Sequence, residues 1–210
     1  MPNYRSEPKA ADDLVGQIER AGGRAVAVAG DVAKEEEVVA MFDRVTGVFG
    51  RIDILVANAG VQRDARLAEM TLDQWNSVIA SNLTGQFLCV REAVRRFDAQ
   101  GASAHSRAIG KIICMSSVHD VIPWAGHVNY AASKGGVDLL MRSVAQEVAP
   151  RRIRVNSISP GAIATDINKD ARATAEQREK LLKLIPYGRI GEPDDVARSR
   201  SGSPRMPPTT

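Results

Sequence analysis

This sequence of 210 residues contains only two cysteines and no long apolar run, and it has no acidic residue after Asp195. Each of these absences excludes a class of protein. Cys89 falls in a helical pattern and Cys114 in a strand pattern, and their spacing suggests neither a metal site nor a disulfide framework. No apolar run reaches the length of a membrane span, and the amino terminus lacks a signal-peptide core. These absences predict a cytoplasmic protein with no membrane partner.

The formal net charge of +3 arises at the end of the chain. Arg198, Arg200 and Arg205 account for the whole excess, because basic and acidic residues balance up to Asp195. No basic stripe indicates a nucleic-acid partner. Residues 198–210 are rich in Ser, Pro and Arg without periodicity, which predicts a disordered basic tail after one domain over residues 1–197.

Strand and helix patterns alternate along that domain. Strands are predicted at 24–29, 52–57, 111–115 and 153–158, and helices at 7–21, about 34–49, 71–97, 130–148, 175–185 and from about 193. Thr71 with Gln74 has the form of a capping box at the start of one helix. This alternation is typical of an α/β fold with a Rossmann-like, doubly wound, mainly parallel sheet.

Three polar side chains are predicted to meet at the end of one strand. Ser117 follows an apolar run and so lies at a carboxyl end, where parallel sheets place their ligands. Tyr130 and Lys134 lie one helical turn apart on a common face. We expect the ammonium of Lys134 to favour the phenolate of Tyr130 and lower its pKa. A Tyr-x-x-x-Lys pair alone is weak evidence, but the three groups together suit acid–base chemistry at an alcohol or carbonyl.

Two other segments follow predicted strands and allow two interpretations each. Asn58-Ala59-Gly60 comes after 52–57, where the glycine would let the backbone approach a ligand, or the segment is a plain turn. The segment from Pro160 to Thr165 comes after 153–158. It would offer backbone groups and a hydroxyl at the same sheet edge, although alone it is a turn.

Asp31 and Asn82 also leave alternatives open. The carboxylate of Asp31, next to Val32 at a strand end, could accept a hydrogen bond from a nucleotide base or could cap the helix near Lys34. Asn82 lies on an otherwise apolar helical face, and a buried amide needs partners. It could hold a water beside Lys134, or stabilise a kink near Gly85.

Together these residues resemble the short-chain dehydrogenase/reductase family over roughly residues 3–197. Asn58-Ala59-Gly60 looks like the family's Asn-Ala-Gly loop, and Pro160-Gly161 through Thr165 looks like its nicotinamide-side loop. The residues that look like the family's catalytic tetrad are Asn82, Ser117, Tyr130 and Lys134. Within the family the run 116–124 is similar to bacterial glucose 1-dehydrogenases, with 3-oxoacyl-carrier-protein reductases as the nearest competitors.

The resemblance implies an NAD- or NADP-dependent oxidoreductase that interconverts a secondary alcohol or sugar hydroxyl and a carbonyl. It implies that Tyr130 is the general acid/base, that Lys134 lowers its pKa and holds the nicotinamide ribose, that Ser117 binds the substrate oxygen, and that Asn82 serves a proton relay. It implies further cofactor contacts by Arg5, Asp31, Val32, Asn58, Ala59, Gly60, Pro160, Gly161, Ile163 and Thr165. Arg5, near the adenosine ribose, would admit NADP. Family subunits usually form homotetramers.

The chain departs from the family pattern at both ends. The 210 residues contain no G-x-x-x-G-x-G motif, which forms the turn that binds the pyrophosphate in the family. The sequence after 192–197 has no periodic pattern of apolar residues. We therefore expect a sheet that lacks the family's first strand, first helix and last strand. The alternative to a dehydrogenase is a non-catalytic truncated fragment that pairs with full-length subunits through the helices at 75–97 and 130–148.

The loop between Ser117 and Tyr130 contains three large ring side chains. His119, Trp124 and His127 could meet sugar hydroxyls there, or they could simply pack the loop. The substrate itself stays open at this level.

Overall fold

The computed structural model describes residues 1–103, 106–169 and 172–199 and divides the chain into two compact units, Met1–Ser157 and Ile158–Thr210. The first unit holds a three-stranded sheet in the order β3 (Ile54–Ala57), β4 (Gly110–Met115), β5 (Ile153–Ile158). β3 and β4 are parallel, with Ile54 opposite Lys111 and Ala57 opposite Cys114. This register brings the residues after Ala57 level with the end of β4, which places two of the predicted site segments at one edge.

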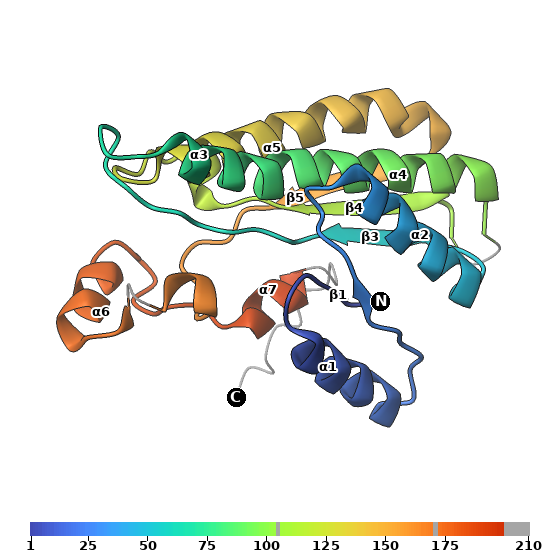
Figure 1. The fold of residues 1–210 in the computed structure, drawn as a ribbon, viewed down its shortest axis with the longest axis horizontal. Helices are drawn as coiled ribbons and strands as arrows, with labels where there is room; N and C mark the ends of the chain where they lie inside the picture. The colour runs from blue at the N-terminus through green and yellow to red at the C-terminus, as the bar shows by residue number, and fades with distance from the viewer. Residues whose placement is uncertain (104–105, 170–171, 200–210) are drawn as a thin grey trace, which may run out of the picture. The chain divides into compact units, whose positions relative to one another are not determined.

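Two long helices, α4 (Gly85–Gln100) and α5 (Val128–Val148), lie along this sheet, as Figure 1 shows. The core includes apolar side chains of α4, β4, α5 and β5, among them the fully buried Phe97, Ile112 and Val137. Because β4 alternates buried and half-buried residues, one face of the strand packs against the helices. The buried Cys89 and Cys114 belong to the same core, and burial raises the pKa of both thiols to about 11.

A second, smaller parallel sheet joins β1 (Asn3–Tyr4) to β2 (Val28–Ala29), beside helices α1 (Pro8–Arg20) and α2 (Glu35–Phe49). The predicted strand at 24–29 is therefore too long. Its ladder ends after two residues because its partner β1 offers only two. The expected parallel α/β architecture is confirmed, but in the part of the chain that the structure describes the strands form two sheets.

The helix predicted at 71–97 is divided by a wider turn. α3 (Leu72–Ile79) begins with the predicted capping box of Thr71 and Gln74, and the π-helix η1 (Ala80–Thr84) connects it to α4. Such π turns are rare and often lie at functional sites. Short 3₁₀ turns, η2 (Val118–Asp120) and η3 (Ala149–Arg151), flank α5.

The second unit contains η4 (Asp166–Asn168), α6 (Ala175–Leu182) and α7 (Pro193–Ser199). The predicted helices at 175–185 and from 193 are confirmed, with α6 ending at Leu182. Of the predicted tail 198–210, Arg198 and Ser199 end α7, and residues 200–210 lie outside the described residues. Within the described ranges no helix has the length and apolarity needed to cross a membrane.

Candidate active site

Ser117, Tyr130 and Lys134 converge at the carboxyl end of β4, as their spacing predicts. Ser117 is the second residue after β4, and all three side chains are buried, with exposed fractions of 6%, 9% and 4%. The Lys134 ammonium lies 5.5 Å from the centroid of the Tyr130 ring. A side-chain hydrogen bond joins Ser117 to Tyr130. A hydroxyl, a phenol and an amine thus share one buried corner of the first unit.

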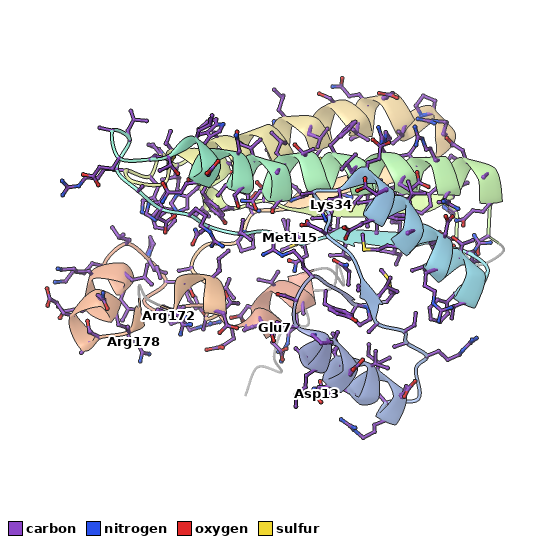
Figure 2. All side chains as sticks on the ribbon, in the orientation of Figure 1. Glu7, Asp13, Lys34, Met115, Arg172 and Arg178 are labelled. Carbon is purple, nitrogen blue, oxygen red and sulfur yellow. The ribbon has the colours of Figure 1, made fainter. Side chains whose placement is uncertain are left out.

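The end of β4 fixes the position of Lys134. Its Nζ donates to the carbonyl of Met115, labelled in Figure 2, at 2.8 Å. The Ser116 hydroxyl in turn donates to the Lys134 carbonyl at 3.1 Å. Burial lowers the pKa of Lys134 to about 8, so this amine exchanges its proton close to neutral pH.

The pKa of Tyr130 differs from the expectation. Burial raises it above the ordinary value, while the hydrogen bond with Ser117 acts in the opposite direction. Lys134 does not produce the expected lowering, because its ammonium is directed to the Met115 carbonyl and is itself desolvated. Tyr130 therefore holds its proton more tightly than an exposed phenol does.

Asn82 lies in the π turn and is fully buried. Its side chain forms a reciprocal pair with Val61, whose amide N–H donates to Oδ1 at 2.8 Å and whose carbonyl accepts from Nδ2 at 3.0 Å. Nδ2 also donates to the Ser133 hydroxyl at 3.1 Å. Asn82 therefore ties the loop after β3 to α5 at Ser133. The interpretation of Asn82 as part of a helix distortion near Gly85 fits this position, while its role in holding a water beside Lys134 stays a prediction.

Gly60 brings the loop backbone against two of these groups. A Cβ at this position would lie 3.3 Å from Asn82 Oδ1 and 3.8 Å from Lys134 Nζ. The Asn58-Ala59-Gly60 segment thus reaches the same corner as the tetrad. The close approach of the backbone, which the sequence predicts for a glycine here, favours a binding loop over a plain turn.

Asn129 is a site residue that the sequence interpretation missed. It is fully buried, its Oδ1 accepts from the Tyr130 amide N–H at 2.8 Å, and its Nδ2 donates to the Arg63 carbonyl at 2.8 Å. Asn129 therefore fixes the start of α5 to the loop before α3. An asparagine just before the key tyrosine, in the first turn of a helix, was the available signal.

The loop between Ser117 and Tyr130 forms a stack of rings. His119 lies 4.2 Å from Trp124 and His127 lies 3.4 Å from it, measured between ring centroids and with nearly parallel planes. Since both faces of the indole are covered, Trp124 has no free face for a sugar ring. The packing interpretation therefore fits this residue better than a direct sugar contact.

The predicted adenine-side residues occupy the first unit. Asp31 Oδ1 accepts from the Ala33 amide N–H at 3.0 Å, so it stabilises its own turn and does not cap α2, whose N-cap is Lys34. Val32 packs against α4, where a Cβ on Gly85 would lie 2.7 Å from its Cγ2. Arg5 is exposed just after β1.

The predicted nicotinamide-side loop belongs to the second unit. Ile163 bridges to Gly191, and the Thr165 hydroxyl donates to the Ile163 carbonyl at 3.5 Å. Pro160 and Gly161 precede this bridge. The loop is therefore held by contacts within its own unit.

A nicotinamide dinucleotide fits the residues of the first unit at one end. The buried Lys134 amine and the close backbone of Gly60 form a corner suited to a ribose hydroxyl. Lys134 and the loop 58–60 would hold that end. The glycine-rich turn that would hold the phosphates is missing from the 210 residues.

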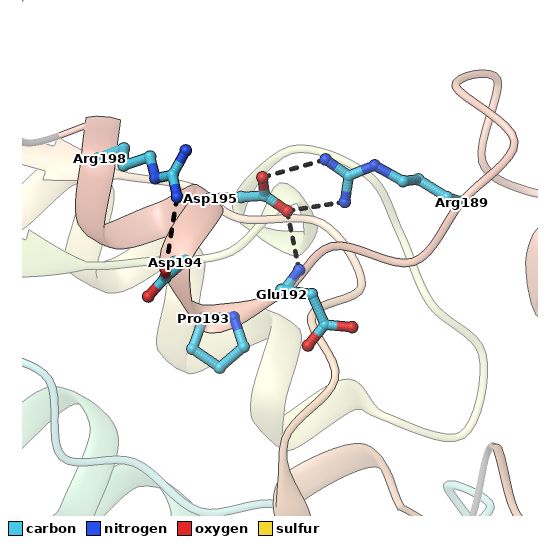
Figure 3. A pocket seen from close by; sticks show the side chains of 6 residues that line it. All are labelled: Arg189, Glu192, Pro193, Asp194, Asp195 and Arg198. Carbon is cyan, nitrogen blue, oxygen red and sulfur yellow. Dashed lines mark hydrogen bonds and ion pairs between the residues drawn. The ribbon is translucent and has the colours of Figure 1, made fainter.

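The second unit contains a pocket whose side chains are mostly charged. It is lined by Arg189, Glu192, Pro193, Asp194, Asp195 and Arg198, shown in Figure 3. Arg189 binds the Asp195 carboxylate through two nitrogens at 2.7 and 3.0 Å and holds its pKa at about 2. Asp195 also accepts from the Glu192 amide N–H at 2.8 Å, so this group organises the start of α7.

A parallel α/β unit with a buried serine, tyrosine and lysine at a strand end defines a class of oxidoreductase. The family model described as enoyl-(acyl carrier protein) reductase matches residues 3–200. The chain belongs to the short-chain dehydrogenase/reductase family.

Three relatives illustrate the range of the family. The chain is 44% identical to 3beta-hydroxysteroid dehydrogenase 1 of Eggerthella lenta over 197 residues, which cover 94% of this chain and 73% of the relative. It is 39% identical to glucose 1-dehydrogenase 2 of Bacillus subtilis over 196 residues, covering 93% and 73%. The crystal structure of a gluconate 5-dehydrogenase from Burkholderia cenocepacia with NADP and tartrate superposes with a TM-score of 0.85 at 33% identity, covering 94% and 74%.

These relatives confirm the predicted family, the dehydrogenase ancestry and the Rossmann-like fold class. They include a glucose dehydrogenase, as the sequence resemblance indicates, but also a steroid dehydrogenase of higher identity. The family is therefore established, while the substrate is not.

Proposed function

We propose that the chain is an NAD- or NADP-dependent oxidoreductase that interconverts a secondary alcohol and a carbonyl. The observation that carries the proposal is the buried meeting of Ser117, Tyr130 and Lys134 at the end of β4. The named activities of the relatives, on a steroid, glucose and gluconate, all concern hydroxyl-bearing small molecules. A polyol or another small alcohol is the proposed substrate class, as in glucose 1-dehydrogenases.

The protein's own part in this reaction is the transfer of a proton. The bound cofactor would accept or supply the hydride. In carbonyl reduction, the Tyr130 hydroxyl donates its proton to the substrate oxygen, and in alcohol oxidation the phenolate takes the proton back. The Ser117 hydroxyl donates a hydrogen bond to the same oxygen, and the Lys134 ammonium stabilises the phenolate once the proton has left.

Asn82 and the cofactor-side residues complete the proposal. Asn82 holds the backbone at Val61 against α5 and so keeps Gly60 close to Lys134. Lys134 and the loop 58–60 would bind the nicotinamide ribose. The adenine side is assigned to Arg5, Asp31 and Val32, and the carboxamide side to Pro160, Gly161, Ile163 and Thr165.

The decisive test pairs binding with turnover. NADH and NADPH fluorescence titrations of the purified chain should give saturable binding, and glucose and a 3β-hydroxysteroid should be tried as substrates. Tyr130→Phe should lower kcat by about 10²–10⁴-fold while cofactor affinity stays unchanged, because only the proton donor is removed. Tyr187→Phe is the matched control, since Tyr187 is 80% exposed in the second unit. Near-normal turnover of Tyr130→Phe would refute the assigned role.

A second candidate is a non-catalytic subunit that associates with other family subunits. Large apolar residues are exposed on the helices expected at an interface, Phe87 on α4 at 41% and Leu139 on α5 at 66%. Light scattering of the chain mixed with a full-length family subunit should then show a complex that Leu139→Glu dissociates, and the titrations above should show no cofactor binding by the chain alone.

A further inference from the structure

Gln86 is a buried polar side chain to which the proposed reaction assigns no role. It lies in the first turn of α4, is 2% exposed, and its Nε2 donates to the carbonyl of Met115 at 3.0 Å. The Lys134 ammonium donates to the same oxygen at 2.8 Å. Because a backbone carbonyl offers two lone pairs, this one oxygen at the end of β4 joins the amide of Gln86 to the amine of Lys134.

The other end of the Gln86 amide is not satisfied. Its Oε1 is buried and has no hydrogen-bond partner among the described residues. Since the Met115 carbonyl can only accept, the NH₂ group must face it, and turning the amide over would lose the bond. A buried acceptor without a donor costs stability, and an apolar side chain of similar size would avoid that cost. A role in folding alone therefore does not account for a glutamine at this position.

Gln86 and Asn82 are two buried amides on consecutive helical turns. Asn82 lies in η1, and Gln86 follows four residues later, where α4 begins. The Asn82 side chain bonds to Val61 in the loop after β3 and to Ser133 of α5. Gln86 bonds to the last residue of β4. The two amides together connect this helical segment to the three parts of the chain that meet at the candidate site.

The surroundings of Lys134 make its position depend on few contacts. The charged and titratable groups that face it are Cys114 of β4, Asp120 of η2 and Tyr130 of α5, while α4 contributes the neutral Gln86 at the shared oxygen. Burial has removed most of the water that surrounds an exposed ammonium. The direction of the Met115 carbonyl therefore helps to define where the ammonium lies.

We propose that Gln86 is a positioning residue, whose amide fixes the Met115 carbonyl and through it holds the ammonium of Lys134 beside Tyr130. The link from Gln86 to Lys134 does not depend on the reaction, whereas its effect on turnover rests on the proposed function. Without the amide, the carbonyl keeps Lys134 as a donor but can turn from its present direction. The ammonium then has no single position relative to the Tyr130 ring.

Nuclear magnetic resonance of the Lys134 side chain tests the link without any turnover. In a chain with isotope-labelled lysine, the two Hε protons of a fixed side chain have different chemical shifts, and Lys134→Met assigns the signal. Gln86→Met keeps the length of the side chain and removes both the donor and the unpaired acceptor. The shift difference should fall by at least half in Gln86→Met and stay unchanged in Gln17→Met, at an exposed position of α1. An unchanged difference in Gln86→Met overturns the proposal.

Urea unfolding separates positioning from a role in folding. The midpoint of Gln86→Met should be no lower than that of the parent, because the unpaired Oε1 disappears with the donor. A lower midpoint with an unchanged Lys134 signal would mean that Gln86 serves folding alone. If Gln86→Met does not fold, Gln86→Leu takes its place in both measurements.

Gln86→Glu gives an independent check of the same link. A carboxylate at this position should raise the pKa of Lys134 above its value of about 8, measured by titration of the same resonances. An unchanged pKa would mean that the side chain at position 86 does not lie beside the ammonium, and the proposal would fail.

Kinetics then connect Gln86 to the proposed reaction. Gln86→Met should lower kcat about 10-fold and raise KM for the cofactor, while KM for the substrate stays unchanged because Ser117 is not affected. The acidic limb of the pH profile for alcohol oxidation should move to higher pH, because a displaced ammonium stabilises the phenolate less. Parental kcat and pH profile in Gln86→Met would refute the effect on turnover. If Tyr130→Phe retains turnover, the proposed function fails, while the Lys134 signal still decides whether Gln86 positions the ammonium.

Discussion

Burial sets the chemistry of individual side chains in this site more strongly than their neighbours do. Tyr130 and Lys134 lie together as their spacing predicts, yet desolvation raises the pKa of the phenol and lowers that of the amine. Sequence spacing gives the juxtaposition because helix geometry is regular. It cannot give the direction of the pKa shift, because the degree of burial depends on the whole packed unit.

The burial of Lys134 lowers the stability of the folded chain. Its folded pKa of about 8 lies below the ordinary 10.5, so the unfolded chain binds the proton more tightly. Burial of the charged Lys134 therefore lowers the free energy of unfolding by its full amount below pH 8. This loss disappears as the pH rises from about 8 towards 10.5. The difference between the two pKa values corresponds to about 3 kcal/mol at neutral pH.

We expect Lys134→Met to raise the free energy of unfolding at pH 7 by about 2 kcal/mol while abolishing turnover. The gain should shrink as the pH approaches 10. Urea unfolding at several pH values measures both. Lys183→Met, at an exposed ion pair with Glu179, is the control and should change stability by less than about 0.5 kcal/mol. A less stable Lys134→Met protein at pH 7 would contradict this reasoning.

At the scale of elements, the sequence pattern did not predict the π turn between α3 and α4. The capping box at Thr71 was predictable because Thr71 and Gln74 form it between themselves. The π turn was not, since its backbone angles remain helical, as at Thr84, and its wider hydrogen bonding accompanies the contacts of Asn82 with Val61. Those contacts span 21 residues, beyond the reach of helical periodicity.

The length of β2 was predicted wrongly for the same reason. Residues 24–29 have a strand pattern, but the strand exists only where β1 pairs with it, at Val28 and Ala29. By contrast, β5 was predicted with its full bounds, because Ile153 and Val155 alternate with exposed residues. Position in the sheet, not local preference, decides where a ladder ends.

Asn82 allows a test of the π turn. Asn82→Ala would leave the N–H and carbonyl of Val61 without their buried partner, which should lower the free energy of unfolding by about 2–4 kcal/mol. Asn82→Asp keeps the shape but sets a carboxylate against the Val61 carbonyl. Its cost, relative to the parent at the same pH, should therefore be smaller at pH 4.5 than at pH 7, where the carboxyl is charged.

Chemical denaturation at the two pH values measures these differences. Asn76→Asp, at an exposed position of α3, is the matched control and should cost little at either pH. If Asn82→Ala is as stable as the parent, the pair with Val61 contributes no net stability and the π turn has another cause.

At the scale of the whole molecule, stability is concentrated in one part of the first unit. The core cluster draws its buried side chains from α2, α4, β4, α5 and β5. Residues 1–30, with α1 and the β1–β2 ladder, contribute only Ala11 to the buried hydrophobic residues. A segment with so few buried contacts opens at a lower free energy than the core. The two sheets are therefore expected to differ in stability although both are parallel.

Native-state hydrogen exchange followed by mass spectrometry should resolve this difference. Amides of β1 and β2 should exchange by local opening, whereas those of α4 and β4 should exchange only with global unfolding. Asn3→Ala removes the side-chain hydrogen bond to the Gly30 carbonyl, 2.9 Å long, and should speed exchange in the small sheet alone. Phe97→Ala, at a fully buried core position, should cost about 3–5 kcal/mol and speed exchange in α4 and β4 as well. If Asn3→Ala instead speeds exchange in α4, the two sheets unfold as one cooperative unit and the core extends to the amino terminus.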